Sequence, residues 1–203
     1  MENCKLRTEK QTVIFKSRYP EQAFGKTTMK IRNIILLIAL LVIIDQAVKL
    51  IIFNSFMDVN CEIIPKVLAF KPVFNSKYSW VNDSIHNETG MDAGLIFHII
   101  LFALVWSFIY IIYRFLKKLN PENKIADMSI VFFTAAVICA YSGILIWEKG
   151  ILDFLHFKFL GYIICDLKDI YINCFAILFC ISTIKYKFEL KELADYIKGL
   201  YKR

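Results

Sequence analysis

The sequence predicts an all-α transmembrane protein, a four-helix membrane bundle with a small β-rich extracytoplasmic loop subdomain. Of the 203 residues, 58% are hydrophobic and 15% are aromatic, and the mean hydropathy is +0.53. Soluble domains are less apolar than this. The apolar residues are also concentrated in four long runs. These two observations exclude an ordinary soluble fold.

The four hydrophobic runs cover residues 32–53, 93–113, 126–147 and 169–184. A helix needs roughly 20 apolar residues to cross a hydrocarbon core about 30 Å thick. The first three runs reach this length. The last run is the shortest, so we expect it to pack against the other helices or to lie where the bilayer is thinner.

The distribution of basic residues predicts the orientation in the membrane. Eight of the 25 Lys and Arg residues precede residue 33, four lie in 114–124 and six follow residue 184, whereas the other two loops have three each. Because cytoplasmic loops carry the excess of Lys and Arg, both termini are expected in the cytoplasm. The net charge of +7 is then a topology signal that also attracts anionic lipid, and no nucleic-acid partner is expected.

This orientation divides the chain into three parts. We expect a cytoplasmic basic tail at 1–31, a four-helix transmembrane domain at 32–184, and a cytoplasmic amphipathic tail at 185–203. The transmembrane domain includes outer loops at 54–92 and 148–168. Apolar residues at helical spacing within the last tail predict a short amphipathic helix on the inner membrane surface.

A charged pair interrupts the first hydrophobic run. The segment DQAVK places Asp45 and Lys49 four residues apart, on one face of a helix, where they can form an ion pair. Each charge at membrane depth costs on the order of 3 kcal/mol, so the pair must be solvated by the protein interior or lie near the outer surface. The pair either locks this helix to its neighbours or lines a polar pocket, and both can hold.

The outer loop 54–92 is predicted to form short strands on the membrane surface. Its segments 67–70 (VLAF) and 77–81 (KYSWV) alternate with proline and asparagine residues that are typical of turns. Cys61 of this loop and Cys165 of the second loop are expected on the same side of the membrane. They could form a disulfide, but the sequence does not fix their separation.

Three aspartates flank the second outer loop. Asp153 lies near its start, and Asp166 and Asp169 lie where the last hydrophobic run begins. Carboxylates at the edge of a membrane span are costly to desolvate and are therefore functional-site candidates. Because the linker 154–165 is too apolar to extend into water, we expect it to return along the interface and to bring Asp153 towards Asp169.

Two carboxylates that meet in a poorly hydrated pocket cannot both stay ionised, since burial and like charge raise one pKa. One of Asp153 and Asp169 would then be an acid and the other a base at the same pH. Such a pair can activate a water and protonate first the oxyanion and then the leaving amine, as peptide hydrolysis requires. The sequence leaves open whether Asp166 shares the proton with Asp169 instead.

Simpler interpretations of these aspartates remain open. Asp169 could be the N-cap of the last helix, and Asp153 could be an ordinary loop charge. A metal site is chemically possible from the set Asp153, His156, Asp166 and Asp169. We expect no metal, because a lone histidine in an aromatic loop is usually structural. Ser142 has no histidine in the last run as a base, and the HExxH motif of zinc proteases is absent.

Across residues 45–182 the motifs resemble those of the signal peptidase II family, the bacterial lipoprotein signal peptidases. DQAVK is similar to the first box of the family, which matches Asp45, Gln46 and Lys49. FNSKYSW resembles the second box, with Asn75 on the Asn of the family and Trp80 on its aromatic residue.

The later boxes carry the two catalytic positions and two charged departures. ILDF resembles the box that ends in Asp-Phe and places Asp153 on one catalytic aspartate. CDLKD resembles Phe-Asn-x-Ala-Asp and places Asp169 on the second. Within it, Asp166 stands where the family usually has Asn, and Lys168 where it often has Ala.

A third departure lies at the end of the third run. Of the family box Gly-Asn-x-x-Asp-Arg only Gly143 remains, and Ile144 stands at the Asn position. The arginine of the family is missing or shifted to Lys149.

The resemblance implies a cofactor-free, monomeric aspartic endopeptidase of the bacterial cytoplasmic membrane. It would cleave signal peptides from diacylglyceryl-modified prolipoproteins at the outer membrane interface, in contact with membrane lipid. A substrate-binding or structural polar pocket would comprise Asp45, Gln46, Lys49, Asn75 and Asp166. One alternative is a catalytically altered relative that acts as a non-enzymatic binding or assembly protein. A small ion-coupled transporter is disfavoured because no inverted repeat is detectable.

Overall fold

The computed structural model describes residues 29–77, 80–147, 149–160, 163–185 and 190–200. Four helices in these ranges are long and apolar enough to cross a membrane. They are α2 (Ile31–Ser55), α4 (Gly94–Leu119), α5 (Lys124–Ile146) and α6 (Leu167–Lys185). They coincide with the four predicted runs, so the four-helix fold class is confirmed. Nearly all of the basic tail predicted at 1–31 lies outside the described residues.

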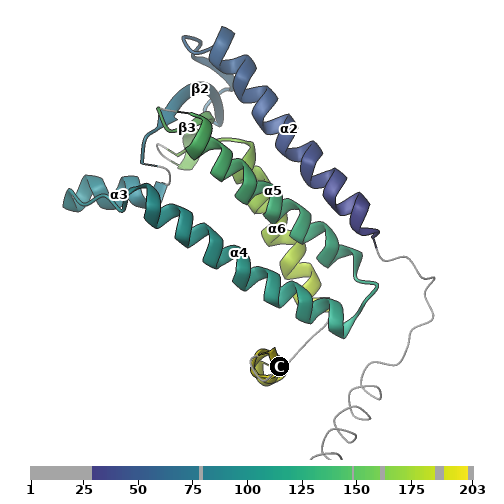
Figure 1. Ribbon diagram of the computed structural model, residues 1–203. Coiled ribbons are helices and arrows are strands. Elements are labelled where there is room, and N and C mark those ends of the chain that lie inside the picture. Colours follow the sequence, from purple (N-terminus) through teal and green to yellow (C-terminus); the bar gives the residue numbers. More distant parts are fainter. Residues whose placement is uncertain (1–28, 78–79, 148, 161–162, 186–189, 201–203) are drawn as a thin grey trace, which may run out of the picture.

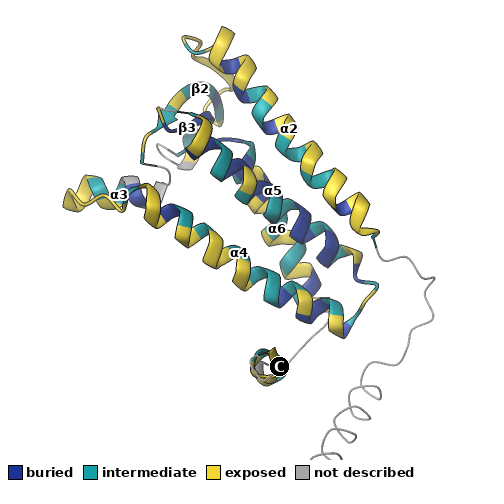
Figure 2. Ribbon diagram, in the orientation of Figure 1, coloured by how far each residue is buried: buried dark blue, intermediate teal, exposed yellow. Residues whose placement is uncertain are grey.

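Helices α5 and α6 lie in the middle of the bundle, with α2 on one flank and α4 on the other (Figure 1). α5 is the most enclosed, because 56% of its most apolar stretch is buried, against 11% to 17% in the other three. The outward faces of α2 and α4 are exposed (Figure 2) and carry large apolar side chains such as Leu40 and Phe108. These faces suit contact with lipid.

Small side chains explain the central place of α5. Ala135, Ala136, Cys139 and Ala140 are all buried. Small residues at a helix interface let neighbouring backbones approach closely, which is how helices gain van der Waals contact in a membrane. The composition of this run therefore fixes which helix the others surround.

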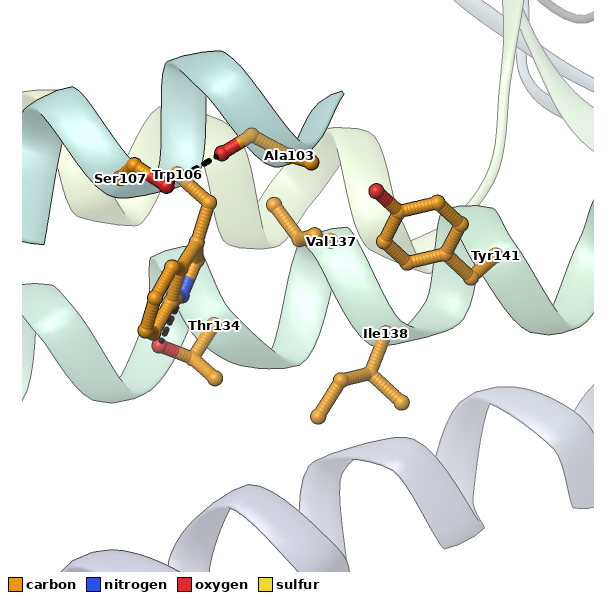
Figure 3. A pocket seen from close by; sticks show the side chains of 7 residues that line it. All are labelled: Ala103, Trp106, Ser107, Thr134, Val137, Ile138 and Tyr141. Carbon is orange, nitrogen blue, oxygen red and sulfur yellow. Dashed lines mark hydrogen bonds between the residues drawn. The ribbon is translucent and has the colours of Figure 1, made fainter. Parts of the chain in front are cut away.

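A shallow apolar groove of about 350 Å³ lies between α4 and α5. Figure 3 shows Trp106 and Ser107 of α4 facing Thr134 and Tyr141 of α5 across it. The indole of Trp106 donates to the Thr134 hydroxyl at 3.1 Å, and the Tyr141 hydroxyl donates to the carbonyl of Ile99 at 2.8 Å. Because these polar groups are bonded within the bundle, they are tolerated at membrane depth.

The two outer loops combine into one antiparallel sheet in the order β1-β2-β3-β4, which lies at one end of the bundle (Figure 1). Its strands are β1 (Cys61–Ile64), β2 (Leu68–Asn75), β3 (Ile151–Phe157) and β4 (Ile164–Cys165). The first loop supplies β1 and β2, and the second supplies β3 and β4. The predicted β-rich subdomain is confirmed.

The strand predicted at 77–81 is wrong for the described residues 77, 80 and 81, whereas residues 78–79 lie outside the described part. The chain instead turns at Lys77, and helix α3 (Trp80–Thr89) begins at Trp80. The backbone N–H of Lys77 donates to the side-chain oxygen of Asn75 at 3.0 Å. Asparagine often forms such a turn with the backbone two residues on, and here the turn follows the end of β2.

The suggested disulfide between Cys61 and Cys165 does not form, and both thiols are free. Cys61 pairs with Phe70, Phe70 with Leu155, and Leu155 with Cys165, so the two cysteines lie on one row across the sheet. Three steps of about 4.8 Å separate them by roughly 14 Å, far beyond disulfide reach.

The expected return of the linker after Asp153 is confirmed, because β4 pairs antiparallel with β3. The start of β3 also depends on a glycine. Gly150 has φ +105°, and a Cβ there would overlap the backbone carbonyl of Asn75 at the end of β2. Glycine alone has little penalty at such a φ, so Gly150 lets β2 and β3 meet closely beside the aspartates.

At the opposite end of the bundle, helix α7 (Leu190–Leu200) packs against α4. Leu193 and Tyr196 contact an apolar cluster that includes Phe115 and Leu116. A helix therefore forms where the amphipathic spacing predicts one, and its apolar side covers the end of α4.

Candidate active site

The start of α6 is held by two aspartates that bond to each other's backbone. The N–H of Asp169 donates to Oδ1 of Asp166 at 3.3 Å, and the N–H of Asp166 donates to Oδ2 of Asp169 at 3.1 Å. This is a reciprocal capping arrangement over the first helical turn. Asp166 precedes the first helical residue, so it occupies the capping position that the sequence suggested for Asp169.

Strand β3 supplies Asp153, which is buried. Val73 of β2 is its partner across the ladder, and Asn75 lies two residues further along β2, on the same face. The amide nitrogen of Asn75 is 3.5 Å from Oδ2 of Asp153, at the outer limit of a hydrogen bond. The sheet register thus brings Asn75 to the carboxylate.

Lys168 joins the three aspartates, and this role was missed in the sequence. Its ammonium is 2.9 Å from Oδ1 of Asp166, 3.2 Å from Oδ1 of Asp153 and 3.3 Å from Oδ2 of Asp169. The sequence identified Lys168 only as a departure from a family motif. A usable signal was its place between two aspartates at the start of an apolar run, where a lysine has to be paired.

The three carboxylates each place one oxygen within 4.8 Å of the others. A water that makes bonds of about 2.8 Å can bridge oxygens at this separation. His156 cannot contribute to the metal site considered from the sequence. It is three residues from Asp153 in β3, so its side chain projects from the opposite face of the sheet. Positive charge at the cluster comes from Lys168.

The charged pair of α2 extends into this cluster. Lys49 lies 2.9 Å from Asp45, as the sequence predicts, and also 2.6 Å from Oδ2 of Asp166. Gln46 donates to the same Asp45 oxygen at 2.8 Å. Asp45 and Lys49 are fully buried, so the pair is solvated by the protein interior and ties α2 to the start of α6.

The electrostatics distinguish Asp166 from Asp153. Burial would raise the pKa of Asp166, but Lys168 and Lys49 together hold it below its usual value, so Asp166 stays ionised. Burial raises the pKa of Asp153 to about 6, and Asp166 and Asp169 add to the rise while Lys168 opposes it. Asp153 is therefore protonated below about pH 6, whereas Asp166 remains ionised there.

Comparison with known proteins agrees with this geometry. Residues 37–185 match the family model of signal peptidase (SPase) II. The chain belongs to the signal peptidase II family. Signal peptidase II is a family of membrane proteases, so the resemblance noted in the sequence motifs is confirmed. A search of curated proteins finds no match.

Two solved structures have a fold similar to that of this chain. Both are described as a bacterial membrane enzyme determined by the in meso method, one at 2.3 Å and one at 1.9 Å resolution, and both are 20% identical to this chain. The aligned region of the first structure covers 80% of this chain and 93% of the solved chain, with a TM-score of 0.61. The second covers 80% and 99%, with a TM-score of 0.59. At this identity they establish the fold alone.

Two positions of the altered motif at the end of α5 can now be placed. Gly143 is buried, and a Cβ there would lie 3.1 Å from Ile151, so this glycine lets β3 sit on the end of α5. Lys149, suggested as a shifted form of the family's arginine, is exposed. The lysine that contacts Asp153 and Asp169 is Lys168.

Proposed function

We propose that the protein is an aspartic endopeptidase that removes signal peptides from lipid-modified prolipoproteins. The observation that carries the proposal is the approach of Asp153 and Asp169 within 4.8 Å at the sheet end of a signal peptidase II bundle. The two residues come from separate segments and are both matched to the catalytic positions of the family. Their spacing supports a shared water as the nucleophile.

The roles of the two carboxylates follow from their surroundings. Asp169 is the more exposed and accepts the proton of the attacking water. Asp153, whose pKa is raised to about 6, donates its proton to the carbonyl oxygen of the scissile bond. When the tetrahedral intermediate collapses, the proton taken by Asp169 passes to the leaving amine, and a hydroxyl proton of the intermediate returns to Asp153 as the carbonyl re-forms.

The position of the pair suits a membrane-anchored substrate. Asp153 lies in the sheet and Asp169 in the first turn of α6, where the bundle meets the sheet. A signal helix that spans the same bilayer presents its cleavage site at this level. With both termini in the cytoplasm, as the basic residues indicate, this end faces outwards.

The alternative is a relative that has lost activity and serves as a membrane binding or assembly protein. Asp166 and Lys168 favour it, because both replace residues usual at these positions of the family. The two functions differ in one measurable property, cleavage of a lipidated precursor.

The test is gel-shift processing of a lipidated prolipoprotein by purified protein. Asp153→Asn and Asp169→Asn should each abolish cleavage while the protein is still expressed and inserted in the membrane. Asp92→Asn is the matched control, because Asp92 is an outer-loop carboxylate that pairs with Lys77, and it should cleave normally. Cleavage by both active-site variants at the wild-type rate would refute the aspartic mechanism.

A further inference from the structure

The three aspartates around Lys168 differ in how far they are exposed. The side chain of Asp166 is 0% exposed, that of Asp153 is 6% and that of Asp169 is 32%, while Lys168 is 11% exposed. A substrate therefore approaches from the side of Asp169. The ammonium of Lys168 is closest to Asp166, the most buried of the three carboxylates.

We propose that Lys168 is a positioning residue of this peptidase, with Asp166 as its fixed counter-ion, and that it holds Asp153 and Asp169 in reach of one water. The inference rests on the proposed function. Lys168 reaches one oxygen of each catalytic carboxylate at 3.2 Å and 3.3 Å. Without a cation there, the two carboxylates repel each other across a poorly hydrated space.

The anchor for Lys168 is Asp166. Oδ1 of Asp166 lies 2.9 Å from the ammonium of Lys168, and Oδ2 lies 2.6 Å from the ammonium of Lys49. Asp166 also caps the helix that carries Lys168 and Asp169. Asp166 is therefore held by Lys49, by Lys168 and by the first turn of α6, and its fixed carboxylate in turn orients the ammonium of Lys168.

Asp166 and Lys168 are also the two charged departures within the CDLKD motif. One adds a negative charge where Asn is usual, the other adds a positive charge where Ala is common, and the two charges are in contact. They form a charge-balanced exchange. We therefore expect either charge to impair cleavage when the other charge is missing, and to be tolerated when both are present.

The test compares Lys168→Ala, Asp166→Asn and the double variant Asp166→Asn/Lys168→Ala in the precursor assay. Each single change should lower kcat by about tenfold, the effect of breaking a buried charge coupling, with little change in KM. The double variant should lose no more rate than Lys168→Ala alone, because Asp166 acts through Lys168. Lys158→Ala is the matched control, because Lys158 pairs with Glu62 on the sheet surface, and it should be neutral.

The pH profile separates positioning from a merely structural role. Lys168 lowers the pKa of Asp153, so Lys168→Ala should move the upper limb of the kcat profile to higher pH, and Lys168→Arg should keep it in place. The other charged and titratable groups around the cluster are unchanged in both variants. Cys165 of β4 lies on the side of Asp153 and Asp169, and Asp45 and Lys49 of α2 and Cys139 of α5 lie on the side of Asp166.

Several outcomes would overturn the inference. Lys168→Ala with wild-type or higher rate would mean that the lysine is dispensable or blocks the water. If the losses of kcat in the single variants add up in the double variant, the two residues are not coupled. If the upper limb of the kcat profile stays at the same pH in Lys168→Ala, the lysine has only a structural role. Failure of the proposed function gives a different result. In that case the wild-type protein does not cleave the precursor, or Asp153→Asn and Asp169→Asn still cleave it.

Discussion

Four aspartates and two lysines form one connected network in this protein. It runs from Asp45 through Lys49 and Asp166 to Lys168, and ends at Asp153 and Asp169. Removing one member of a buried ion pair leaves an uncompensated charge, which costs more than the pair contributes. The network is therefore sensitive to single changes and more tolerant of paired ones.

This sensitivity predicts the effect of Lys49→Met. The change leaves Asp45 without a cation and Asp166 with only Lys168, so the free energy of unfolding should fall by about 3 to 5 kcal/mol. Denaturant unfolding in detergent micelles measures it. Lys77→Met removes an exposed pair with Asp92 and should cost about 1 kcal/mol or less. Equal losses in the two variants would contradict the burial argument.

The pKa of Asp153 predicts a pH dependence. Burial raises it to about 6, so Asp153 is protonated below this pH and loses its proton above it. Because the proposed mechanism needs Asp153 as the acid, the processing rate should fall as the pH rises through about 6. Initial rates of precursor cleavage from pH 5 to pH 8 would show the limb. A rate that climbs steadily over this range would instead make Asp153 the base.

At the scale of elements, the site depends on how closely β2 and β3 meet. Asn75 ends β2 with a turn, Gly150 precedes β3, and the register between the strands places Asn75 near Asp153. The reciprocal bonds of Asp166 and Asp169 then set the first turn of α6. Each of the two carboxylates proposed as catalytic is thus fixed by its own strand or helix, and the return through β4 connects these two elements.

Gly150→Ala tests the close approach of the strands. The added Cβ would overlap the carbonyl of Asn75 at a φ of +105°, so we expect a loss of about 1 to 3 kcal/mol in stability and a lower cleavage rate. Melting temperature and precursor processing measure the two effects. Gly199→Ala in α7, where a Cβ meets no atom within 4 Å, is the control and should not destabilise. A harmless Gly150→Ala would show that the strands can separate without cost.

At the scale of the whole molecule, the orientation in the membrane decides which side the site faces. We predict that a membrane-impermeant maleimide applied to intact cells labels a variant that retains only Cys61, which is exposed on β1. A variant that retains only Cys4, in the basic tail outside the described residues, should react only after permeabilisation. The reverse pattern would place the carboxylates on the cytoplasmic side.

Part of the site could be predicted from the sequence because it lies in local patterns. The pair of Asp45 and Lys49 follows from helical spacing alone, and the return of the linker after Asp153 follows from its apolar character. The turn at Lys77 was missed because KYSWV has the composition of a strand. The role of Lys168 was missed because it depends on three partners, of which Asp153 comes from another segment.

Hydropathy and the placement of basic residues were enough to predict the membrane class, the four spans and the expected orientation. Hydropathy is a sum over neighbouring residues, so a span can be recognised without knowing its partners. The folded contacts were needed to show that Asp166 caps α6 and that Lys168 joins it to Asp153 and Asp169. Those contacts depend on strand register and helix packing between distant segments, which local patterns do not specify.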